Sequence, residues 1–518
     1  MEHDCENSVT VKAGEIAPAK GGDVDGHHLS TEHLRGLVER RTLSGGFVGA
    51  LAQGCQLALA LAYNAVLARL LSPTDFGLVA MALTVTGFLQ IFKEAGLSTA
   101  TIQREDITHA QVSNLFWINL GVSGLATITT ALSAPLISWF FHEPQLVAIS
   151  ASLAISFLLE GPAVQHIALL NRQMRFKLMS AIEVSSLVAG FLVGVVMAYR
   201  SWGYWSLVAA TLSTSAIRLI AVWAVLPWRP QRPTRGSGTR SLVHFGADLT
   251  LVGVVYALSR GSDSLLIGRF LGSEAIGLYS RATALLIRPM ERLTAPIYAV
   301  IVPALSRLQT EPDRYRAMFL QVFEGLAIGG FLFTGVFLPL AHPLVIVVLG
   351  QRWEAAAPIF AGLTLAALYL PLSTATSWLY TSQGRGRELL LMASIGAGVM
   401  VSSFILGLPY GPTGVATAYS LSGILVQLPL TFYLAGRRGP LGAKDLWLAI
   451  LRHWPVCLVV LGVTWLASSS GLASSPLPRL LLSAAAGVLA GAITILLSSR
   501  NRRAAMRILG ALNELRVA

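Results

Sequence analysis

Long apolar segments, separated by short polar connections, occupy most of this 518-residue chain. A helix needs about 20 mostly apolar residues to cross the hydrocarbon core of a bilayer. Fourteen segments reach that length: 43–68, 76–100, 111–138, 146–170, 179–199, 203–226, 242–268, 276–305, 317–348, 355–381, 388–409, 412–435, 446–467 and 479–499. The sequence therefore predicts an all-α integral membrane protein with about 14 transmembrane helices. A twelve-span count is the alternative, because Arg452, His453 and Pro455 interrupt the thirteenth segment.

The charge of the chain fits a membrane protein better than a nucleic-acid binder. Only 12% of the residues are charged, about half the fraction of a typical soluble domain. The net charge is +12, but most of the cations lie between apolar segments, where they set membrane orientation and contact anionic lipid. We therefore expect a lipid bilayer as the surroundings and no nucleic acid as a partner. The three cysteines show no metal-ligand spacing, so neither a metal nor a cofactor is predicted.

Basic residues predict the orientation of the chain. With the N-terminus in the cytoplasm, the inside connections and tails contain 24 Lys and Arg residues and the outside connections contain 5. Cytoplasmic loops carry the excess of Lys and Arg in membrane proteins. Both termini are therefore expected in the cytoplasm, which requires an even number of spans.

A repeated phrase divides the chain into two halves. "LARLLSPTDFGLVAMA" (67–82) and "IGRFLGSEAIGLYSRA" (267–282) align without a gap and share five residues: Arg69/Arg269, Leu71/Leu271, Gly77/Gly277, Leu78/Leu278 and Ala82/Ala282. Six spans separate the copies, so both enter the membrane in the same direction, as in parallel transporter repeats. The alternative is that two unrelated hairpins share the same turn chemistry.

This repeat predicts two pseudo-symmetric six-helix lobes followed by two C-terminal helices. The Pro-, Gly- and Arg-rich loop at the middle of the chain is typical of a linker between them. The expected divisions are a disordered or amphipathic cytoplasmic tail (1–42), an N-terminal lobe (43–228), a basic cytoplasmic linker (229–240), a C-terminal lobe (241–435), two extra helices (446–499) and a basic cytoplasmic tail (500–518).

Cations within the apolar segments are the candidate substrate-binding residues. Arg281, Arg288 and Arg292 are spaced by seven and four residues, so they share one helical face. Arg288 lies roughly 18 Å along its span, near the middle of the membrane. The further candidates are Arg260, Lys93 and Arg218. Arginine binds phosphate through a planar fork that stays charged, so the pattern predicts an anion site. The alternative is a set of structural salt bridges between helices.

Carboxylates and prolines in the spans suggest coupling and movement. Glu94, Asp263 and Glu324 are the candidates for proton or sodium coupling, because a membrane carboxylate can bind a cation or titrate. The alternative is that they only neutralise neighbouring arginines.

Span 276–305 contains three prolines, Pro289, Pro296 and Pro303. We therefore expect this span to be kinked or locally unwound, as a moving gate requires.

Signatures of common enzyme classes are missing from the sequence. There is no phosphate-binding loop ending in Gly-Lys-Ser/Thr, no HExxH and no GxSxG. The connections outside the membrane are short. We therefore expect no enzyme, and a membrane-embedded glycosyltransferase or polymerase is the less favoured alternative.

Three stretches in the second half of the chain resemble a known family. "DSLLIGRFLGSEAIGLYSRA" (263–282), "VPALSRLQTEPDRYRAMF" (302–319) and "GQRWEAAAPIF" (350–360) resemble Wzx-type polysaccharide flippases, in the WzxC-like branch of the multidrug/oligosaccharidyl-lipid/polysaccharide exporter superfamily. The resemblance covers roughly residues 40–440. It departs from the family pattern at Gly261 and Ser262, so local side-chain roles there are not carried over.

The resemblance implies two six-helix lobes in a V around a central cationic cavity. It also implies the cargo, an undecaprenyl-pyrophosphate-linked oligosaccharide that moves from the cytoplasmic to the periplasmic leaflet of the bacterial inner membrane by alternating access. The implied pathway is exopolysaccharide, O-antigen or lipopolysaccharide biosynthesis, with a polysaccharide polymerase and a chain-length regulator as partners. A cation-coupled drug exporter of the same superfamily is the alternative, although a cationic cavity would repel many cationic drugs.

Overall fold

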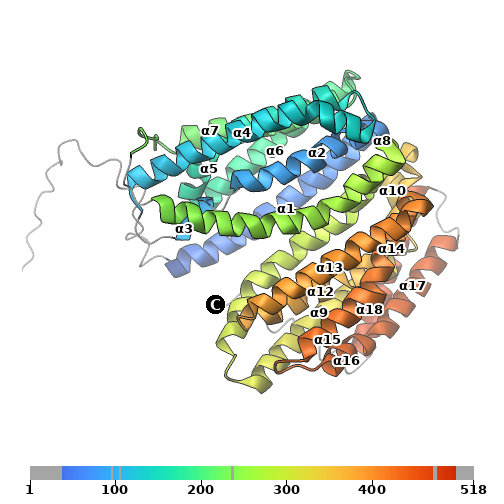
Figure 1. Ribbon diagram of the computed structural model, residues 1–518. Coiled ribbons are helices and arrows are strands. Elements are labelled where there is room, and N and C mark those ends of the chain that lie inside the picture. The colour runs from blue at the N-terminus through green and yellow to red at the C-terminus, as the bar shows by residue number, and fades with distance from the viewer. Residues whose placement is uncertain (1–37, 95–96, 104–106, 235–238, 471–474, 498–518) are drawn as a thin grey trace, which may run out of the picture.

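The computed structural model describes residues 38–94, 97–103, 107–234, 239–470 and 475–497, and these residues form helices joined by short turns (Figure 1). The first group of helices, called the first lobe here, contains α1 (Val38–Leu70), α2 (Pro73–Glu94), α3 (Leu97–Gln103), α4 (His109–Phe141), α5 (Leu146–Arg172), α6 (Phe176–Tyr199) and α7 (Trp205–Val225). The predicted tails lie largely outside the described residues.

The long helix α8 (Thr239–Arg307) leads from the first lobe into the second lobe. Its elements are α9 (Pro312–Phe337), α10 (Ala341–Val348), η2 (Gln351–Trp353), α11 (Ala356–Thr364), η3 (Leu365–Leu368), α12 (Leu370–Ser382), α13 (Gly386–Gly407), η4 (Leu408–Tyr410), α14 (Gly411–Ser422), η5 (Gly423–Gln427), α15 (Leu428–Gly436), α16 (Ala443–Leu451), α17 (Trp454–Ser469) and α18 (Pro476–Leu497).

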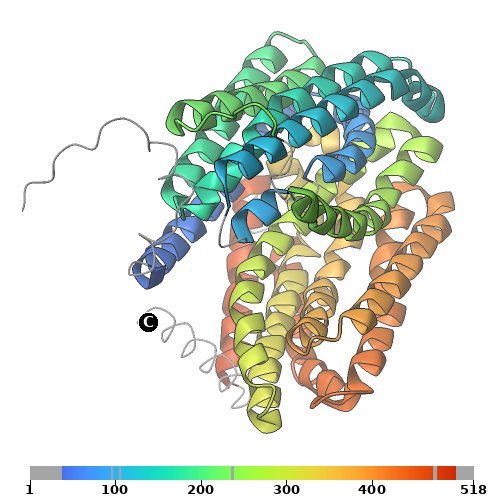
Figure 2. The ribbon, with the colours of Figure 1, turned by 60° about the vertical axis from the view of Figure 1, so that its left-hand side comes forward.

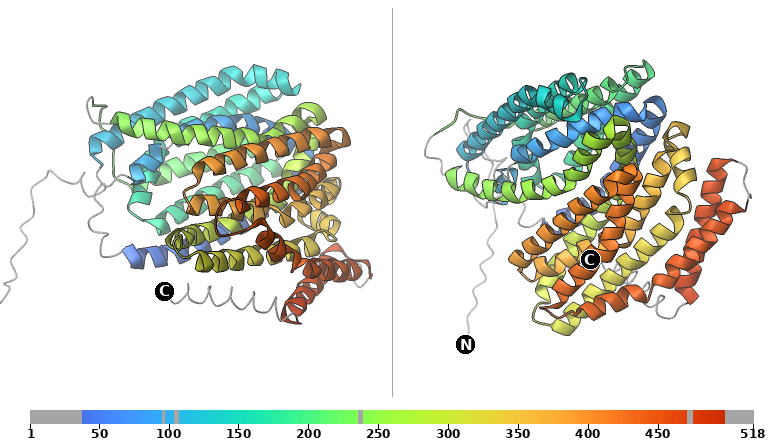
Figure 3. Two further views of the ribbon diagram at one scale, coloured as in Figure 1. Left: turned by 60° about the horizontal axis from the view of Figure 1, so that its bottom comes forward. Right: turned by 45° about the vertical axis from the view of Figure 1, so that its right-hand side comes forward.

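The two lobes meet at one end and diverge toward the other, so the ribbon has the outline of a V (Figure 1). They remain distinct when viewed from a second side (Figure 2). Most helices share one general direction, as expected of helices that cross a bilayer together (left panel of Figure 3). The prediction of an all-α membrane fold with two lobes is confirmed.

Exposed apolar side chains mark the faces that contact lipid. On α4, Leu132 is 77% exposed and Trp139 is 72% exposed. Such a continuous apolar face would be unfavourable in water, whereas in a membrane it lies against lipid that is equally apolar. The small and polar residues of α4, such as Ser123 and Thr130, are buried against neighbouring helices, which is the usual pattern of membrane helix packing.

The described part of each predicted span is almost entirely helical, as one helix, as part of α8 or as two or three consecutive helices. Among the described residues, nine helical stretches are long and apolar enough to cross a membrane. The thirteenth predicted span is divided into α16 and α17, and the break lies at Arg452 and His453. The count of fourteen crossings stays a prediction.

Helix α8 breaks at a glycine and not at its prolines. Gly272 has φ 85° and ψ −178° and is the residue with non-helical angles inside α8. Only glycine adopts this conformation readily. The helix continues through Pro289, Pro296 and Pro303. The predicted local unwinding there is therefore wrong, and a kink stays a prediction. A proline removes one helical hydrogen bond, and a helix packed among others in a membrane tolerates that loss.

The part of α8 before Gly272 packs against the first lobe. A Cβ atom built on Gly268 would stand 2.7 Å from the Phe141 ring of α4 and 3.3 Å from Met81 of α2. Helix α8 also contacts α3 and runs beside it in Figure 1. The sequence division begins the C-terminal lobe at residue 241, and that division stays a prediction. In the structure, the chain passes from one lobe to the other at Gly272.

The beginning of the linker is fixed to the first lobe. Asn114 of α4 forms two hydrogen bonds with the backbone of Thr234: Nδ2 donates to the carbonyl oxygen at 2.7 Å, and Oδ1 accepts from the amide at 2.9 Å. The Trp117 indole N–H donates to the Gln231 carbonyl at 2.8 Å. The Trp228 side chain is fully buried. Residues 227–234 therefore belong structurally to the first lobe.

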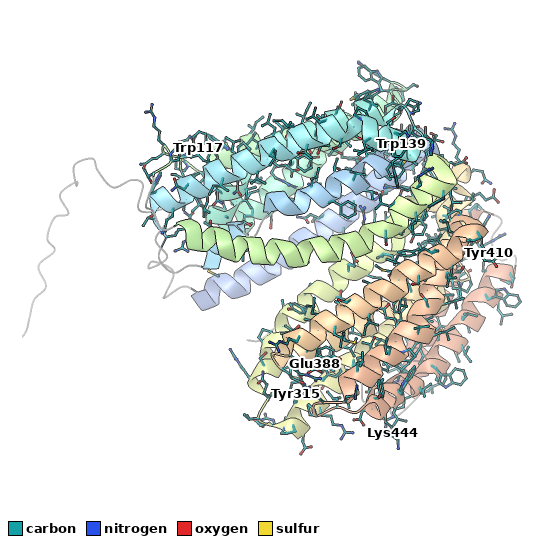
Figure 4. The ribbon with its side chains drawn as sticks, in the orientation of Figure 1. Trp117, Trp139, Tyr315, Glu388, Tyr410 and Lys444 are labelled. Atoms are coloured by element: carbon teal, nitrogen blue, oxygen red, sulfur yellow. The ribbon has the colours of Figure 1, made fainter. Side chains whose placement is uncertain are left out.

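The orientation predicted from the basic residues can be tested with reporter fusions. In Figure 4, Trp139 and Tyr410 lie toward the end where the lobes meet, and Trp117 lies at the opposite end of α4. We expect alkaline phosphatase fused after Phe141, Gln351 or Tyr410 to be active in the periplasm. Fusions after Gln173 or Arg235 should be inactive. Active enzyme at either of these last two positions would contradict the predicted orientation.

Candidate functional site

The two copies of the repeated phrase pack directly on each other where the lobes meet. A Cβ atom on Gly77 would stand 1.7 Å from the Ser273 carbonyl oxygen, and one on Gly277 would stand 1.9 Å from the Pro73 carbonyl oxygen. Pro73 and Ser273 occupy the same position of the two copies, so the contact is reciprocal. We call this contact the seam, together with the neighbouring contacts that Asn64, Ala68, Phe76, Glu143, Arg281 and Trp353 make between the lobes. The shared glycines let two helix N-termini approach more closely than any side chain permits.

A carboxylate lies at the start of each of the two helical segments that meet at the seam. The Ser72 amide and hydroxyl donate to Asp75 Oδ2 at 3.0 and 2.6 Å. In the second copy, the Ser273 hydroxyl donates to Glu143 Oε1 at 2.7 Å. Glu143 belongs to the first lobe, so this hydrogen bond crosses the seam. A carboxylate at a helix N-terminus is stabilised by the helix dipole.

Trp353 joins the second lobe to the first. Its side chain is fully buried, and its indole N–H donates to the Ala68 carbonyl at 2.7 Å. Its ring meets Phe76 edge-to-face, with 5.4 Å between the centroids. Arg69 of α1 donates to the Val347 carbonyl at 2.6 Å nearby. The seam is therefore held by hydrogen bonds and close aromatic packing on both sides.

Arg281, a predicted substrate-binding residue, lies in the seam. Its guanidinium donates to Asn64 Oδ1 of α1 and lies 4.4 Å from the centroid of the Phe76 ring. Both partners come from the first lobe. Arg281 therefore connects the lobes in this conformation.

Arg288 lies two helical turns from Arg281 on the same face of α8. Its side chain is exposed, whereas Arg281 is only partly so. The face of α8 that contacts the first lobe at Arg281 is thus exposed at Arg288. The side chains of Arg260, Arg292, Lys93 and Glu94 lie outside the described residues, so their predicted roles stay predictions.

Glu183 and Glu160 form polar contacts between helices of the first lobe. Arg218 of α7 forms an ion pair of 2.7 Å with Glu183 of α6, and both are partly exposed. Glu160 of α5 accepts a hydrogen bond from Ser215 at 2.8 Å and another from Gln90 at 3.4 Å. Arg218, a predicted substrate-binding residue, thus has a carboxylate partner.

The predicted coupling carboxylates have separate surroundings. Asp263 accepts from the Ser264 amide at 2.5 Å on α8. Glu324 of α9 faces Arg452 at 3.6 Å and the buried His453 at 3.9 Å. Glu324 therefore belongs to a different group of contacts from the seam, which is built from α1, α2, α8 and the segment around Trp353.

Asn64, Trp353 and Glu143 are not among the site residues predicted from the sequence. Asn64 lies three residues before the first copy of the phrase, and Trp353 lies within "GQRWEAAAPIF". The duplicated glycines were the available signal that two such segments meet. Nothing in the sequence paired the first copy with Trp353, which lies 285 residues after Ala68.

Comparison with known proteins places this chain in a family. Residues 66–358, more than half of the chain, match the model of the family described as "Polysaccharide biosynthesis protein". The chain belongs to this polysaccharide biosynthesis protein family. The matched region contains both copies of the repeated phrase and most of the seam.

Relatives in the polysaccharide biosynthesis protein family agree with that assignment. The chain is 25% identical over 436 residues to the lipopolysaccharide biosynthesis protein WzxC of Escherichia coli, covering 82% of this chain and 87% of the relative. It is 26% identical over 350 residues to the teichuronic acid biosynthesis protein TuaB of Bacillus subtilis, covering 67% and 72%. The succinoglycan biosynthesis transport protein ExoT of Rhizobium meliloti is 25% identical over 334 residues, covering 64% and 67%. The resemblance to Wzx-type polysaccharide flippases is confirmed.

Solved structures share the fold. The lipid II flippase MurJ in an inward closed conformation superimposes with a TM-score of 0.70 at 14% identity, covering 86% of this chain and 97% of MurJ. A multidrug MATE transporter in an inward-facing conformation gives 0.55 at 13% identity, covering 80% and 98%. This family member therefore shares the fold of these two proteins.

Proposed function

We propose that this protein is a flippase for a lipid-linked oligosaccharide, acting in exopolysaccharide, O-antigen or lipopolysaccharide biosynthesis. The cargo is an undecaprenyl-pyrophosphate-linked repeat unit, carried from the cytoplasmic to the periplasmic leaflet of the bacterial inner membrane. The proposal draws on the polysaccharide relatives and on the fold shared with a lipid II flippase. It assigns the protein no enzymatic step.

The arrangement of Arg281 and Arg288 is the observation that supports this function most directly. Both lie on one face of α8, with Arg281 in the seam and Arg288 exposed beyond it. A pyrophosphate entering between the diverging lobes would meet Arg288 first. Bound there, it could compete with Asn64 for the guanidinium of Arg281, because arginine donates several hydrogen bonds in a fixed fork.

The proposed cycle is alternating access. In the orientation predicted from the basic residues, the seam faces the periplasm and the diverging ends face the cytoplasm. Cargo would bind from the inner leaflet while the seam is closed. Separation of the seam and approach of the opposite ends would then release it into the outer leaflet. Arg292, Arg260 and Lys93 remain proposed contacts, and Glu94, Asp263 and Glu324 remain proposed coupling groups.

Replacing Arg288 tests the proposed function. Arg288→Ala should weaken cargo binding about 10- to 150-fold, because a hydrogen bond to a charged group contributes about 1.5–3 kcal/mol. Arg288→Lys keeps the charge but loses the fork, so it should restore binding only in part. The measurement is the transfer of a defined lipid-linked oligosaccharide across the bilayer of proteoliposomes.

Arg437→Ala is the matched control for this experiment, because Arg437 is also an exposed arginine but lies at the end of α15. It should transfer the lipid normally. If the purified parent protein moves a cationic drug and not the lipid-linked oligosaccharide, the drug-exporter alternative is correct. If Arg288→Ala flips the cargo as fast as Arg437→Ala, the phosphates bind elsewhere.

A further inference from the structure

A pocket with a volume of about 320 Å³ lies between α9 and α16, away from the seam. It is lined by a set of charged and small apolar residues: Asp313, Arg316, Ala317, Leu320, Glu324, Asp445, Leu448, Ala449 and Arg452. Helix α16 and the beginning of α9 lie on the side of the second lobe that faces away from the first (Figure 1 and right panel of Figure 3). The pocket is therefore separate from the path proposed for the oligosaccharide.

Two ion pairs of opposite polarity bridge the two walls of this pocket. At one end, Arg316 of α9 contacts Asp445 of α16 at 2.5 Å. At the other end, Glu324 of α9 faces Arg452, just after α16, at 3.6 Å. The lining residues recur every three or four positions on both helices, so each helix presents one continuous stripe to the pocket.

The charges leave both a cation and an anion available to a ligand. Arg452 is 52% exposed and its contact with Glu324 is long, so most of its five donors are not used by that contact. Arg316 is 47% exposed beside Asp445. Asp313 is exposed in the first turn of α9. Arg316 pairs with Asp445 and Arg452 pairs with Glu324, so neither of these ion pairs involves Asp313. A ligand that carries one negative and one positive group would be neutralised at both ends.

Apolar side chains beside the pocket indicate where the rest of the ligand lies. Leu448 lines it and is 39% exposed, and Leu451 follows on α16 and is 56% exposed. The charged residues of α16 lie in its first turn, and apolar residues follow from Leu446 to Leu451. Its start, like that of α9, is predicted to lie at the cytoplasmic surface. The pocket is thus placed at the level of lipid headgroups, next to an apolar surface suited to acyl chains.

We propose that this pocket binds a zwitterionic phospholipid through its phosphoethanolamine headgroup. The phosphate is held between Arg316 and Arg452, and the ammonium group is held by Asp313. The acyl chains follow the exposed leucines of α16. Bound lipid would hold α9 and α16 together at the base of the second lobe. The assignment does not depend on which cargo the protein moves.

Native mass spectrometry of the purified full-length protein tests the assignment. Phosphatidylethanolamine and phosphatidylglycerol are added separately at equal concentration, and the retained lipid adducts are compared. We expect phosphatidylethanolamine to be retained about tenfold more than phosphatidylglycerol, because only its headgroup carries a positive charge that can pair with the Asp313 carboxylate. Asp313→Asn, a change at an exposed residue, should abolish this preference.

Filling the pocket separates binding there from general lipid adhesion. Ala317 lines the pocket and is exposed, so Ala317→Trp should fill it without disturbing the core, and phosphatidylethanolamine adducts should fall about tenfold. The matched control is Ala131→Trp at an exposed position of α4, which should retain the lipid as the parent does. Equal retention of the two lipids by the parent, or unchanged retention in Ala317→Trp, would overturn the proposal. If soluble glycerophosphoethanolamine, added at the same concentration as the lipid, displaces the bound phosphatidylethanolamine, the pocket recognises the free headgroup and the proposal of a membrane lipid is overturned.

Discussion

Gly277→Val is expected to abolish transport while the protein still reaches the membrane. A Cβ atom at this position would lie 1.9 Å from the Pro73 carbonyl oxygen. The obstacle is backbone, so no side-chain rotation can relieve the clash, and the lobes must separate at the seam. Overpacking costs about 3 kcal/mol at the upper end of its usual range, which shifts the equilibrium toward the separated state about 150-fold.

Thiol labelling from outside the cell measures this separation. Ser273 is 8% exposed, so the thiol introduced by Ser273→Cys, in a chain with its three native cysteines replaced, should react slowly with a membrane-impermeant maleimide. Adding Gly277→Val should make the reaction much faster. Gly77→Val should act similarly, because its Cβ would lie 1.7 Å from the Ser273 carbonyl oxygen.

Gly329→Val is the control for the glycine substitution. Gly329 is also within a helix, but a Cβ atom there would meet nothing within 4 Å. This variant should transport normally and leave the thiol introduced at position 273 protected. Normal transport by Gly277→Val would show that the seam need not close during the cycle.

Trp353→Ala is expected to produce the second large effect, a marked loss of stability together with an open seam. Replacing a buried tryptophan by alanine costs about 3–5 kcal/mol, and here the hydrogen bond to Ala68 is lost as well. Both partners of the indole, Ala68 and Phe76, belong to the first lobe. The expected result is a lower midpoint of thermal denaturation in detergent and, in the Ser273→Cys background, faster labelling of the introduced thiol by maleimide.

Two further tryptophan variants separate the contribution of the Trp353 N–H from that of its ring and control for the loss of an exposed tryptophan. Trp353→Phe keeps an aromatic ring beside Phe76 but loses the N–H, so about 1 kcal/mol should be lost. Trp139→Ala removes a ring that is 72% exposed on α4, and it should change neither measurement. Trp353→Ala with an unchanged denaturation midpoint and slow labelling would mean that this residue does not hold the lobes together.

The sequence predicted the parts of this fold that depend on local pattern. Apolar length located the helices, and the duplicated phrase around Gly77 and Gly277 predicted two related lobes. The spacing of Arg281 and Arg288 correctly placed both on one helical face. Each of these features is set by residues within a few turns of one another, so a single sequence is enough to reveal them.

The contacts across the seam could not be predicted in the same way. The partner of Arg281 is Asn64, and the partner of the Trp353 indole is the Ala68 carbonyl. These pairs are far apart along the chain, and their distances depend on how whole helices pack. The three prolines of α8 predicted a kink or local unwinding, but the helix is not unwound at them, because proline tolerance in a membrane helix is decided by its neighbours. The actual break at Gly272 had only a single glycine as its signal.

The position of Gly272 has a consequence for how the protein is made. When the ribosome has completed α7, the first lobe still lacks the stretch of α8, including Gly268, that packs on α2 and α4. The first lobe can reach the arrangement seen here only after translation has passed residue 272. A gene split within the linker would leave that stretch on the wrong polypeptide. A gene split after Gly272 would give an N-terminal fragment that carries this stretch of α8 together with the helices it packs on.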